Sequence, residues 1–317
     1  MSDLPQSVTI QEEGPREGFQ IEKGPIATVD KISLIEALAE TGLKKIDCVS
    51  YVNPARVPGM SDADEVARRI RKRPGVVYTG LWLNRQGFLR ALGLPLDLIG
   101  SLMVSASETF SRKNTGKTIE ETCADQRETL SLYRVHDVPV RWGVVFTAFG
   151  CNYEGEVPLA AVLDRCASLI ALADEQGARL EGLYLADTVG WANPLALQRR
   201  VGAVRERWPQ MRIGLHLHDT RGTGLPNALA ALQMGVDQFD SSVAGLGGCP
   251  FAAHAGAAGN ICTEDFVFMC HEMGVETGID LDRLIDCALM AERIVGHALP
   301  GKVMKGGSLT RLRQASR

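Results

Sequence analysis

Short apolar runs alternate with amphipathic stretches along most of the chain. Eight runs have the length and the bordering turn residues of buried strands, and they begin near Val8, Lys45, Val76, Leu96, Val138, Leu183, Ile213 and Gln238. The stretches between them repeat apolar residues at helical spacing over residues 29–41, 62–73, 119–133, 159–176, 194–208 and 224–234. Strands that alternate with helices in this way predict parallel βαβ units.

The number of units narrows the architecture to two parallel forms. Eight successive units predict a closed (β/α)8 barrel, the TIM barrel of the α/β class. An open, doubly wound sheet stays the alternative, because a count of strands does not prove closure. No Gly-x-Gly-x-x-Gly motif opens an early helix, which disfavours a dinucleotide-binding sheet.

The chain continues beyond the eighth predicted strand. Residues 263–272 and 280–296 have helical patterns, and we expect them to pack beside the barrel. Residues 301–317 are basic and contain glycine, so we expect a mobile tail. The prediction is a single catalytic barrel domain over residues 1–317, with the barrel at about 8–260 and appended helices and tail at about 261–317.

Composition and charge exclude several classes of protein. The 317 residues are 45% hydrophobic, with a net charge of −4 that gives no reason to expect nucleic acid as a partner. A basic cluster at residues 68–73 fits an exposed helix end. No apolar run is long enough to cross a membrane. Eight cysteines without Cys-x-x-Cys spacing indicate reduced thiols and predict a cytoplasmic location.

The pair His216-Leu-His218 is the strongest chemical feature of the sequence. It ends the apolar run that begins near Arg212 and is followed by Asp219. Residues two apart on a strand point to the same face, so both imidazoles could bind one divalent ion. Two histidines alone are a weak metal signal, and the alternative is a polar strand end that frays into a loop.

Further polar residues end other predicted strands. In a (β/α)8 barrel the active site lies at the carboxyl ends of the strands, so these side chains are expected at one mouth. They are Glu17, Asp47, Ser50, Asp187, His216, His218, Asn260 and Glu264. Barrel closure makes the first and last strands neighbours, so Glu17, Asn260 and both histidines can converge on one ion. Such a mixed nitrogen and oxygen set suits Mg²⁺ or Mn²⁺.

Several strings carry a resemblance to a known family. Residues 14–20 (GPREGFQ), 57–60 (VPGM), 216–220 (HLHDT), 243–250 (VAGLGGCP) and 259–265 (GNICTED) resemble 3-hydroxy-3-methylglutaryl-CoA lyases, in the same order along the chain. The resemblance covers residues 8 to about 295. It implies a metal-dependent barrel that cleaves a 3-hydroxy-acyl-CoA to acetyl-CoA and a keto acid by retro-Claisen chemistry.

The resemblance also implies roles for individual residues. The metal ligands would be Glu17, His216, His218 and Asn260. The metal would acidify the substrate hydroxyl, and a carboxylate or histidine beside it, such as His216, would accept the proton. The catalytic set is completed by Arg16 at the thioester oxygen, Cys249 as proton donor on a glycine-rich loop, and Asp47 and Asp187 as orienting or relay groups. The substrate-binding residues would be Arg16, Gln20, Ser50, Val144, Tyr184 and Glu264.

Several of these residues could instead have an ordinary structural role. Arg16 could simply pair with a nearby acid, and Asp187 could cap the segment that follows it. Asn260 could be a plain turn residue, and Cys249 a small buried one.

The sequence departs from the family pattern at the site and in the pocket. Glu17 stands where the family has Asp, and Asp47 stands where it has Glu, a reciprocal exchange of length. Val144 replaces a tyrosine and Tyr184 a serine, and the loop between Cys249 and Asn260 is two residues longer. The acyl group of the substrate could therefore differ, with citramalyl-CoA or a branched 3-hydroxy-acyl-CoA as alternatives.

Two other functions stay open. A Claisen-condensing synthase of the same barrel superfamily would run the chemistry in reverse, and a silent barrel would bind CoA esters without turnover. We expect an acyl-CoA substrate and a homo-oligomer, a dimer or tetramer. Residues 107–114, with Arg112 and Lys113, are a candidate loop for the CoA nucleotide.

Overall fold

Eight parallel strands form one sheet in the computed structural model, which describes residues 4–247, 259–310 and 313. The strands are β1 (Thr9–Glu12), β2 (Lys45–Ser50), β3 (Val77–Leu81), β4 (Gly100–Ser105), β5 (Val140–Phe146), β6 (Gly182–Ala186), β7 (Arg212–His216) and β8 (Gln238–Ser241). Their order in the sheet is β3-β2-β1-β8-β7-β6-β5-β4. All eight predicted strands are present, and each begins within a few residues of its expected position.

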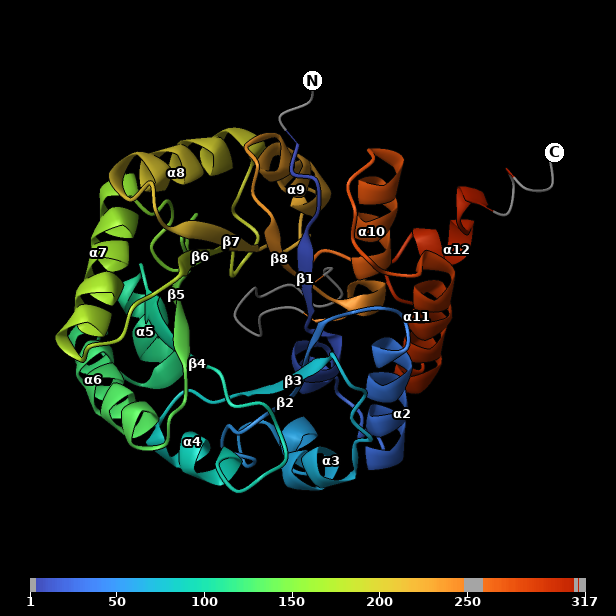
Figure 1. Ribbon diagram of the computed structural model, residues 1–317, viewed down its shortest axis with the longest axis horizontal. Coiled ribbons are helices and arrows are strands. Elements are labelled where there is room, and N and C mark those ends of the chain that lie inside the picture. Colours follow the sequence, from blue (N-terminus) through green and yellow to red (C-terminus); the bar gives the residue numbers. More distant parts are fainter. Residues whose placement is uncertain (1–3, 248–258, 311–312, 314–317) are drawn as a thin grey trace.

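The first strand, β1, pairs in parallel with the last strand, β8, as barrel closure requires. Thr9 lies opposite Gln238 and Glu12 lies opposite Ser241. The strands β3 and β4 end the hydrogen-bonded order, and Asp97 N before β4 donates to the carbonyl of Tyr78 in β3 over 2.8 Å. Figure 1 shows the strands at the centre of a ring of helices. The (β/α)8 barrel is therefore confirmed over the open sheet.

The helices that cover the barrel follow the strands in turn. They are α2 (Thr28–Ala39), α3 (Ala63–Arg69), α4 (Arg85–Ala91), α5 (Glu108–Thr115), α6 (Ile119–Val135), α7 (Leu159–Glu175), α8 (Pro194–Arg207) and α9 (Gly224–Gln233). The pattern predicted six of them and missed α4 and α5, which are too short to show a clear helical repeat. Residues 107–114 were expected as a loop, but residues 108–114 form most of α5. Ser107 is its N-cap and accepts from Phe110 N over 3.1 Å.

The two faces of the strands differ in polarity. The side chains that face the helices are apolar and fully buried, such as Leu185, Leu215 and Phe239. On the alternate positions polar groups are in register across neighbouring strands, with His216 opposite Asp240. The barrel interior is therefore polar at its carboxyl end, and the apolar core lies between the sheet and the helices.

Three more helices follow the barrel: α10 (Thr263–Glu272), α11 (Leu281–Val295) and α12 (Val303–Gly306). Figure 1 shows them together on one side of the ring, beside α2. We expected a mobile tail from residue 301, and this prediction is wrong for the first residues of that segment, which are bound to the rest of the protein. Gly301 N donates to the carbonyl of Ala244 over 3.2 Å, and Asp265 accepts from Val303 N over 2.7 Å. The division between barrel and appended helices stays a prediction.

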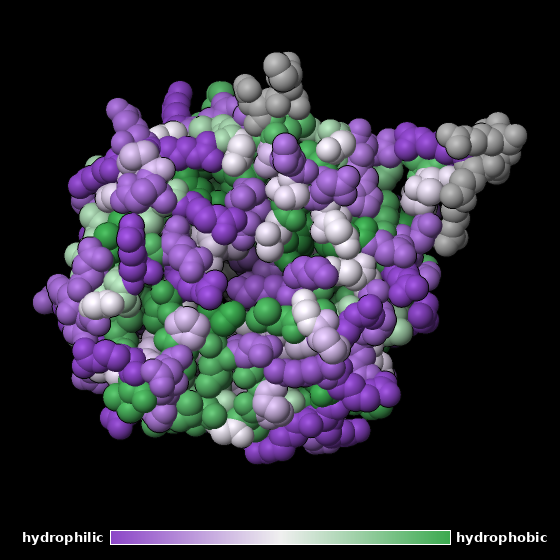
Figure 2. Space-filling view, in the orientation of Figure 1, coloured by the Kyte–Doolittle hydropathy of each residue, from purple (hydrophilic) through white to green (hydrophobic). Residues whose placement is uncertain are grey.

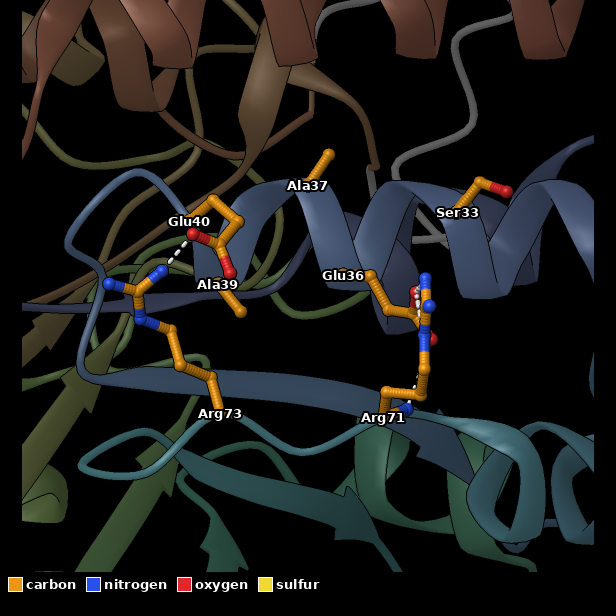
Figure 3. Close-up of a pocket in the computed structure, with 7 residues that line it drawn as sticks. All are labelled: Ser33, Glu36, Ala37, Ala39, Glu40, Arg71 and Arg73. Carbon is orange, nitrogen blue, oxygen red and sulfur yellow. Dashed lines mark hydrogen bonds and ion pairs between the residues drawn. The ribbon is translucent and has the colours of Figure 1, made fainter.

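Ion pairs neutralise the basic cluster at residues 68–73. Helix α3 ends at Arg69, and the chain then passes along α2, where Arg71 pairs with Glu36 and Arg73 with Glu40 around a groove (Figure 3). Both arginines that line the groove are paired with glutamates, so neither is a free cation for an anion. Figure 2 shows polar and apolar side chains interspersed over the face viewed. Within the described ranges, no helix has the length and apolar character needed to cross a bilayer.

Candidate active site

A single turn of π-helix, η1 (Gly14–Gly18), places two of the predicted site residues. Glu17 N donates to the carbonyl of Glu13 over 2.7 Å, and Glu12 accepts from Gly14 N over 2.7 Å, so the turn is fixed to the end of β1. Gly18 packs against Leu246, where a Cβ atom would lie 2.7 Å from the leucine Cβ. The turn directs Arg16 and Glu17 to the carboxyl end of the barrel, as π-bulges at functional sites often do.

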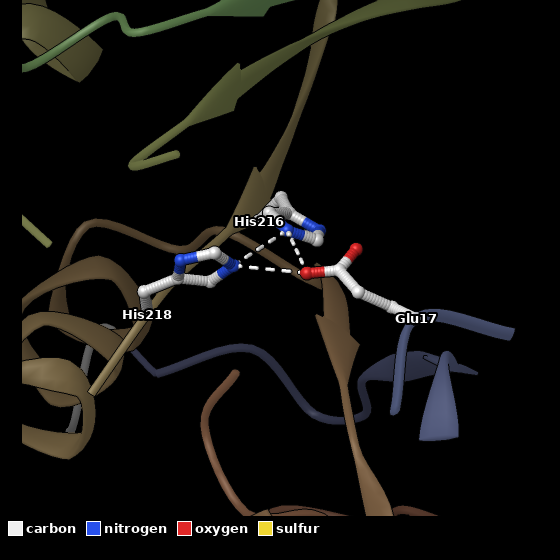
Figure 4. Close-up of side chains that lie close together, drawn as sticks. All are labelled: Glu17, His216 and His218. Carbon is white, nitrogen blue, oxygen red and sulfur yellow. Dashed lines mark hydrogen bonds and ion pairs between the residues drawn. The ribbon is translucent and has the colours of Figure 1, made fainter. Parts of the chain in front are cut away.

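Three predicted metal ligands meet at this mouth (Figure 4). The Nε2 atoms of His216 and His218 are 3.2 Å apart, and Glu17 Oε1 lies 3.1 Å from His218 Nε2 and 3.7 Å from His216 Nε2. Both imidazoles face the same space although His218 lies beyond the end of β7. Two ring nitrogens and a carboxylate oxygen that point at one another are a suitable donor set for a divalent ion.

Asn260 lies beside this group. It pairs with His218 in an isolated antiparallel bridge, and Ile261 N donates to the carbonyl of Leu217 over 3.0 Å. Asn260 is 1% exposed, and neither polar atom of its amide has a hydrogen-bond partner among the described residues. A Cβ atom on Gly247 would lie 2.9 Å from Asn260 Nδ2. An unsatisfied amide is costly in the interior, so it fits a ligand oxygen for Mg²⁺ or Mn²⁺.

Opposite charges at the mouth favour the ionised forms of Glu17 and His216. Burial alone would raise the pKa of Glu17, but His216 and Arg16 hold that pKa well below its usual range. Burial alone would lower the pKa of His216, but the carboxylates of Glu17 and Asp240 raise it well above its usual value. Asp240 Oδ2 lies 3.1 Å from His216 Nδ1, which leaves Nε2 directed at the site.

Arg16 lies among three carboxylates. Its Nε donates to Asp47 Oδ2 over 2.9 Å, its Nη1 to Glu17 Oε2 over 2.8 Å, and its Nη2 to Glu13. Burial raises the pKa of Glu13 well above its usual value, and it also raises the pKa of Asp47, in both cases against the opposing charge of Arg16. The alternative role considered for Arg16, an ion pair with a nearby acid, is therefore present, and these pairs orient the guanidinium beside Glu17.

Three more predicted residues carry buried oxygens that no described group satisfies: Asp187 Oδ2, Ser50 Oγ and Gln20 Oε1. Asp187 Oδ1 accepts from the backbone N–H groups of Trp191 and Ala192 in the loop before α8. The N-cap of α8 is Asn193, so the alternative that Asp187 is a helix cap is wrong. Burial raises the pKa of Asp187, although the nearby charge of His218 lowers it. One oxygen of this carboxyl fixes the loop and the other stays available.

The remaining predicted residues are not members of the group formed by Glu17, His216 and His218. Val144 is half-buried on β5, opposite Tyr184 of β6, whose ring packs against Trp142. Glu264 Oε2 accepts from Ala244 N over 2.9 Å at the base of the glycine-rich loop. Cys249 lies outside the described residues.

Sequence reasoning missed two members of the site. Asp240 orients His216, and Glu13 pairs with Arg16. Asp240 had a usable signal, because it is a carboxylate near the end of the predicted eighth strand, where active-site residues of a barrel are expected. Glu13 follows β1 directly, but nothing in the sequence shows that it contacts Arg16.

The family assignment follows from comparison with known proteins. The model of the HMGL-like family matches residues 7–290. The chain belongs to the HMGL-like family. This HMGL-like protein is 39% identical over 298 residues to the hydroxymethylglutaryl-CoA lyase of Bacillus subtilis strain 168, covering 94% of this chain and 96% of that protein. It is accordingly an enzyme of the carbon–carbon lyase class.

Solved structures agree with this assignment. The crystal structure of the Bacillus subtilis HMG-CoA lyase has a TM-score of 0.88 and 38% identity, over 96% of this chain and 98% of that chain. An HMG-CoA lyase from Acinetobacter baumannii, in complex with coenzyme A and 3-methylmalate, has a TM-score of 0.86 and 37% identity, over 96% of both chains.

Proposed function

We propose that this HMGL-like protein is a divalent-metal-dependent lyase that cleaves 3-hydroxy-3-methylglutaryl-CoA to acetyl-CoA and a keto acid. The observation that carries the proposal is the convergence of Glu17, His216 and His218 beside the unpartnered amide of Asn260. The names of the relatives and the coenzyme A in one of their structures support an acyl-CoA substrate.

The four residues would hold Mg²⁺ or Mn²⁺, which supplies Lewis-acid activation of the substrate's hydroxyl group. Arg16 donates to the thioester oxygen, where negative charge develops as the C–C bond breaks. The base at the mouth that accepts the hydroxyl proton is Asp187, whose Oδ2 has no hydrogen-bond partner among the described residues. His216, the other expected base, has its Nδ1 at Asp240 and its Nε2 at the metal site, so neither ring nitrogen is left to accept a proton. Asp47 orients the Arg16 guanidinium through its Nε.

Cys249 is proposed as the donor of a proton to the acetyl-CoA enolate carbon, on the basis of the family resemblance. The loop that carries it begins at the turn η3 (Val243–Gly245), which Glu264 holds at Ala244 N. Ser50, Gln20, Val144 and Tyr184 would line the acyl pocket, and Glu264 would support it through its hydrogen bond with Ala244 N.

A second substrate is a specific alternative. Tyr184 is a large side chain on the interior face of the barrel, and Val144 lies opposite it in register. A reshaped pocket could select citramalyl-CoA or a branched 3-hydroxy-acyl-CoA for the same chemistry.

The test is acetyl-CoA release from 3-hydroxy-3-methylglutaryl-CoA and from citramalyl-CoA, with Mg²⁺ or Mn²⁺ present and again with EDTA. Metal-dependent release from the first substrate supports the proposal. Release from citramalyl-CoA alone assigns the alternative substrate. Binding of CoA esters with no release from either, and no condensation in the reverse direction, would support the silent barrel.

We also propose a cytoplasmic location and a homo-oligomer. Seven cysteines in the described ranges are free thiols, as expected in a reducing compartment. Light scattering of the purified protein distinguishes a dimer or tetramer from a monomer.

A further inference from the structure

The Arg16 guanidinium has five N–H groups, and three of them are engaged. Asp47 accepts from Nε, Glu17 from Nη1 and Glu13 from Nη2. Among the described residues, no group accepts from the second N–H on each terminal nitrogen, so these two donors are left for a substrate oxygen. The directions of these two donors depend on how firmly the plane of the guanidinium is held.

Glu13 is itself firmly placed. It is 1% exposed, Gln11 Nε2 donates to its second carboxylate oxygen, and its backbone N–H donates to the carbonyl of Ser241 over 2.8 Å. Its own carbonyl accepts from the N–H groups of Arg16 and Glu17 over 3.0 and 2.7 Å. A buried carboxylate held at both oxygens and through its backbone is a rigid support.

Asp47 and Glu13 act on different edges of the guanidinium. Asp47 fixes Nε, close to the axis about which the group can turn, whereas Glu13 fixes the far nitrogen Nη2. Glu17 is shared, because its Oε2 accepts from Arg16 while its Oε1 faces His218. Glu13 is therefore the partner of Nη2 that has no other proposed task.

From this geometry we propose, on the basis of the proposed lyase function, that Glu13 is a positioning residue for the reaction. It holds Arg16 so that the two free N–H groups face the oxygen at which charge develops. A misplaced donor loses most of its effect, because transition-state stabilisation depends on preorganised geometry.

Steady-state kinetics of Glu13→Gln test the proposal. We expect kcat to fall about 10- to 100-fold and KM to change less than about threefold. The affinity for Mn²⁺, measured by titration without substrate, should stay within about threefold. Glu13→Asp keeps the carboxyl group with a shorter reach, so its kcat should lie between those of Glu13→Gln and the wild type. The control is Glu36→Gln, which breaks a Glu–Arg pair on the outer helix α2 and should leave kcat unchanged.

A double-mutant cycle separates positioning from a general structural role. If Glu13 acts through Arg16, Glu13→Gln should cost less than about threefold in an Arg16→Lys background. An equal loss in both backgrounds, an unchanged kcat in the single variant, or a Mn²⁺ affinity weakened more than about tenfold would overturn the proposal. If Glu13→Gln does not fold, Glu13→Asp carries the same cycle.

Different experiments would contradict the positioning role of Glu13 and the proposed lyase function. A wild-type protein without turnover contradicts the function. Crystal structures of the wild type and of Glu13→Gln test the inference without turnover: a rotated Arg16 guanidinium supports it, and an unchanged orientation overturns it.

Discussion

Two groups of potential metal ligands lie at the carboxyl end of the barrel in the described part of the chain, and they differ in whether backbone N–H groups already bind their carboxylates. One is Glu17 with His216 and His218; the other is Cys262, Glu264 and Asp265, on the segment that follows Asn260. In both groups the potential ligand atoms lie within 4.8 Å of one another. Proximity alone therefore does not distinguish them.

Hydrogen bonding does distinguish them. In the second group Asp265 accepts from the N–H groups of Lys302 and Val303, and Glu264 accepts from Ala244 N. The remaining oxygen, Glu264 Oε1, has no hydrogen-bond partner among the described residues and lies against Gly301, where a Cβ atom would be 2.4 Å from it. Both carboxylates of the second group accept backbone N–H groups, so this group joins the C-terminal segment to the turn η3, and we expect it to hold no ion.

The largest expected effect follows from the first group. His218→Ala should lower turnover by at least about 1,000-fold and Mn²⁺ affinity by at least about 100-fold, because a ligand nitrogen is removed. Isothermal titration and acetyl-CoA release measure the two effects. Cys262→Ser in the second group is the matched control and should keep Mn²⁺ affinity. Equal losses in both variants would contradict the distinction.

The second group predicts a pH effect on stability. Burial raises the pKa of Glu264 from 4.5 to about 7. The protonated carboxyl therefore stabilises the folded state fully below about pH 4.5, and this contribution is lost as the pH rises through 7. It amounts to about 3 kcal/mol. Glu264→Gln, which stays neutral, should gain about that much relative to the wild type between pH 5 and pH 8.

Urea unfolding at pH 5, 6, 7 and 8 measures this difference between Glu264→Gln and the wild type. A constant difference across the range would show that the folded and unfolded pKa values of Glu264 are alike. Glu36→Gln on the surface is the control and should show a much smaller pH dependence.

The smallest expected effect is that of Asp265→Ala. The N–H groups of Lys302 and Val303 at the start of α12 would lose their acceptor, at a cost of about 2 kcal/mol in the free energy of unfolding. Chemical denaturation measures the loss, and Mn²⁺ affinity should be unchanged. A weakened Mn²⁺ affinity without lost stability would instead assign Asp265 to metal binding.

Strong repeating patterns made much of the fold predictable. Strand alternation placed His216 and His218 on one face, and the order of strands and helices gave the (β/α)8 barrel. The short helices α4 and α5 and the helix α12 were missed, because a few residues held by caps and tertiary contacts leave little periodicity.

The sequence by itself determined the barrel, the family resemblance and the residues Glu17, His216, His218 and Asn260 as a donor set. Only the tertiary structure decided which oxygens and nitrogens are free. It showed that Glu13 and Asp47 share the Arg16 guanidinium and that Asp265 is taken by α12. The reason is physical: residue type and strand period are local properties, whereas the partner of each polar atom depends on segments far apart in the chain that meet only in the folded barrel.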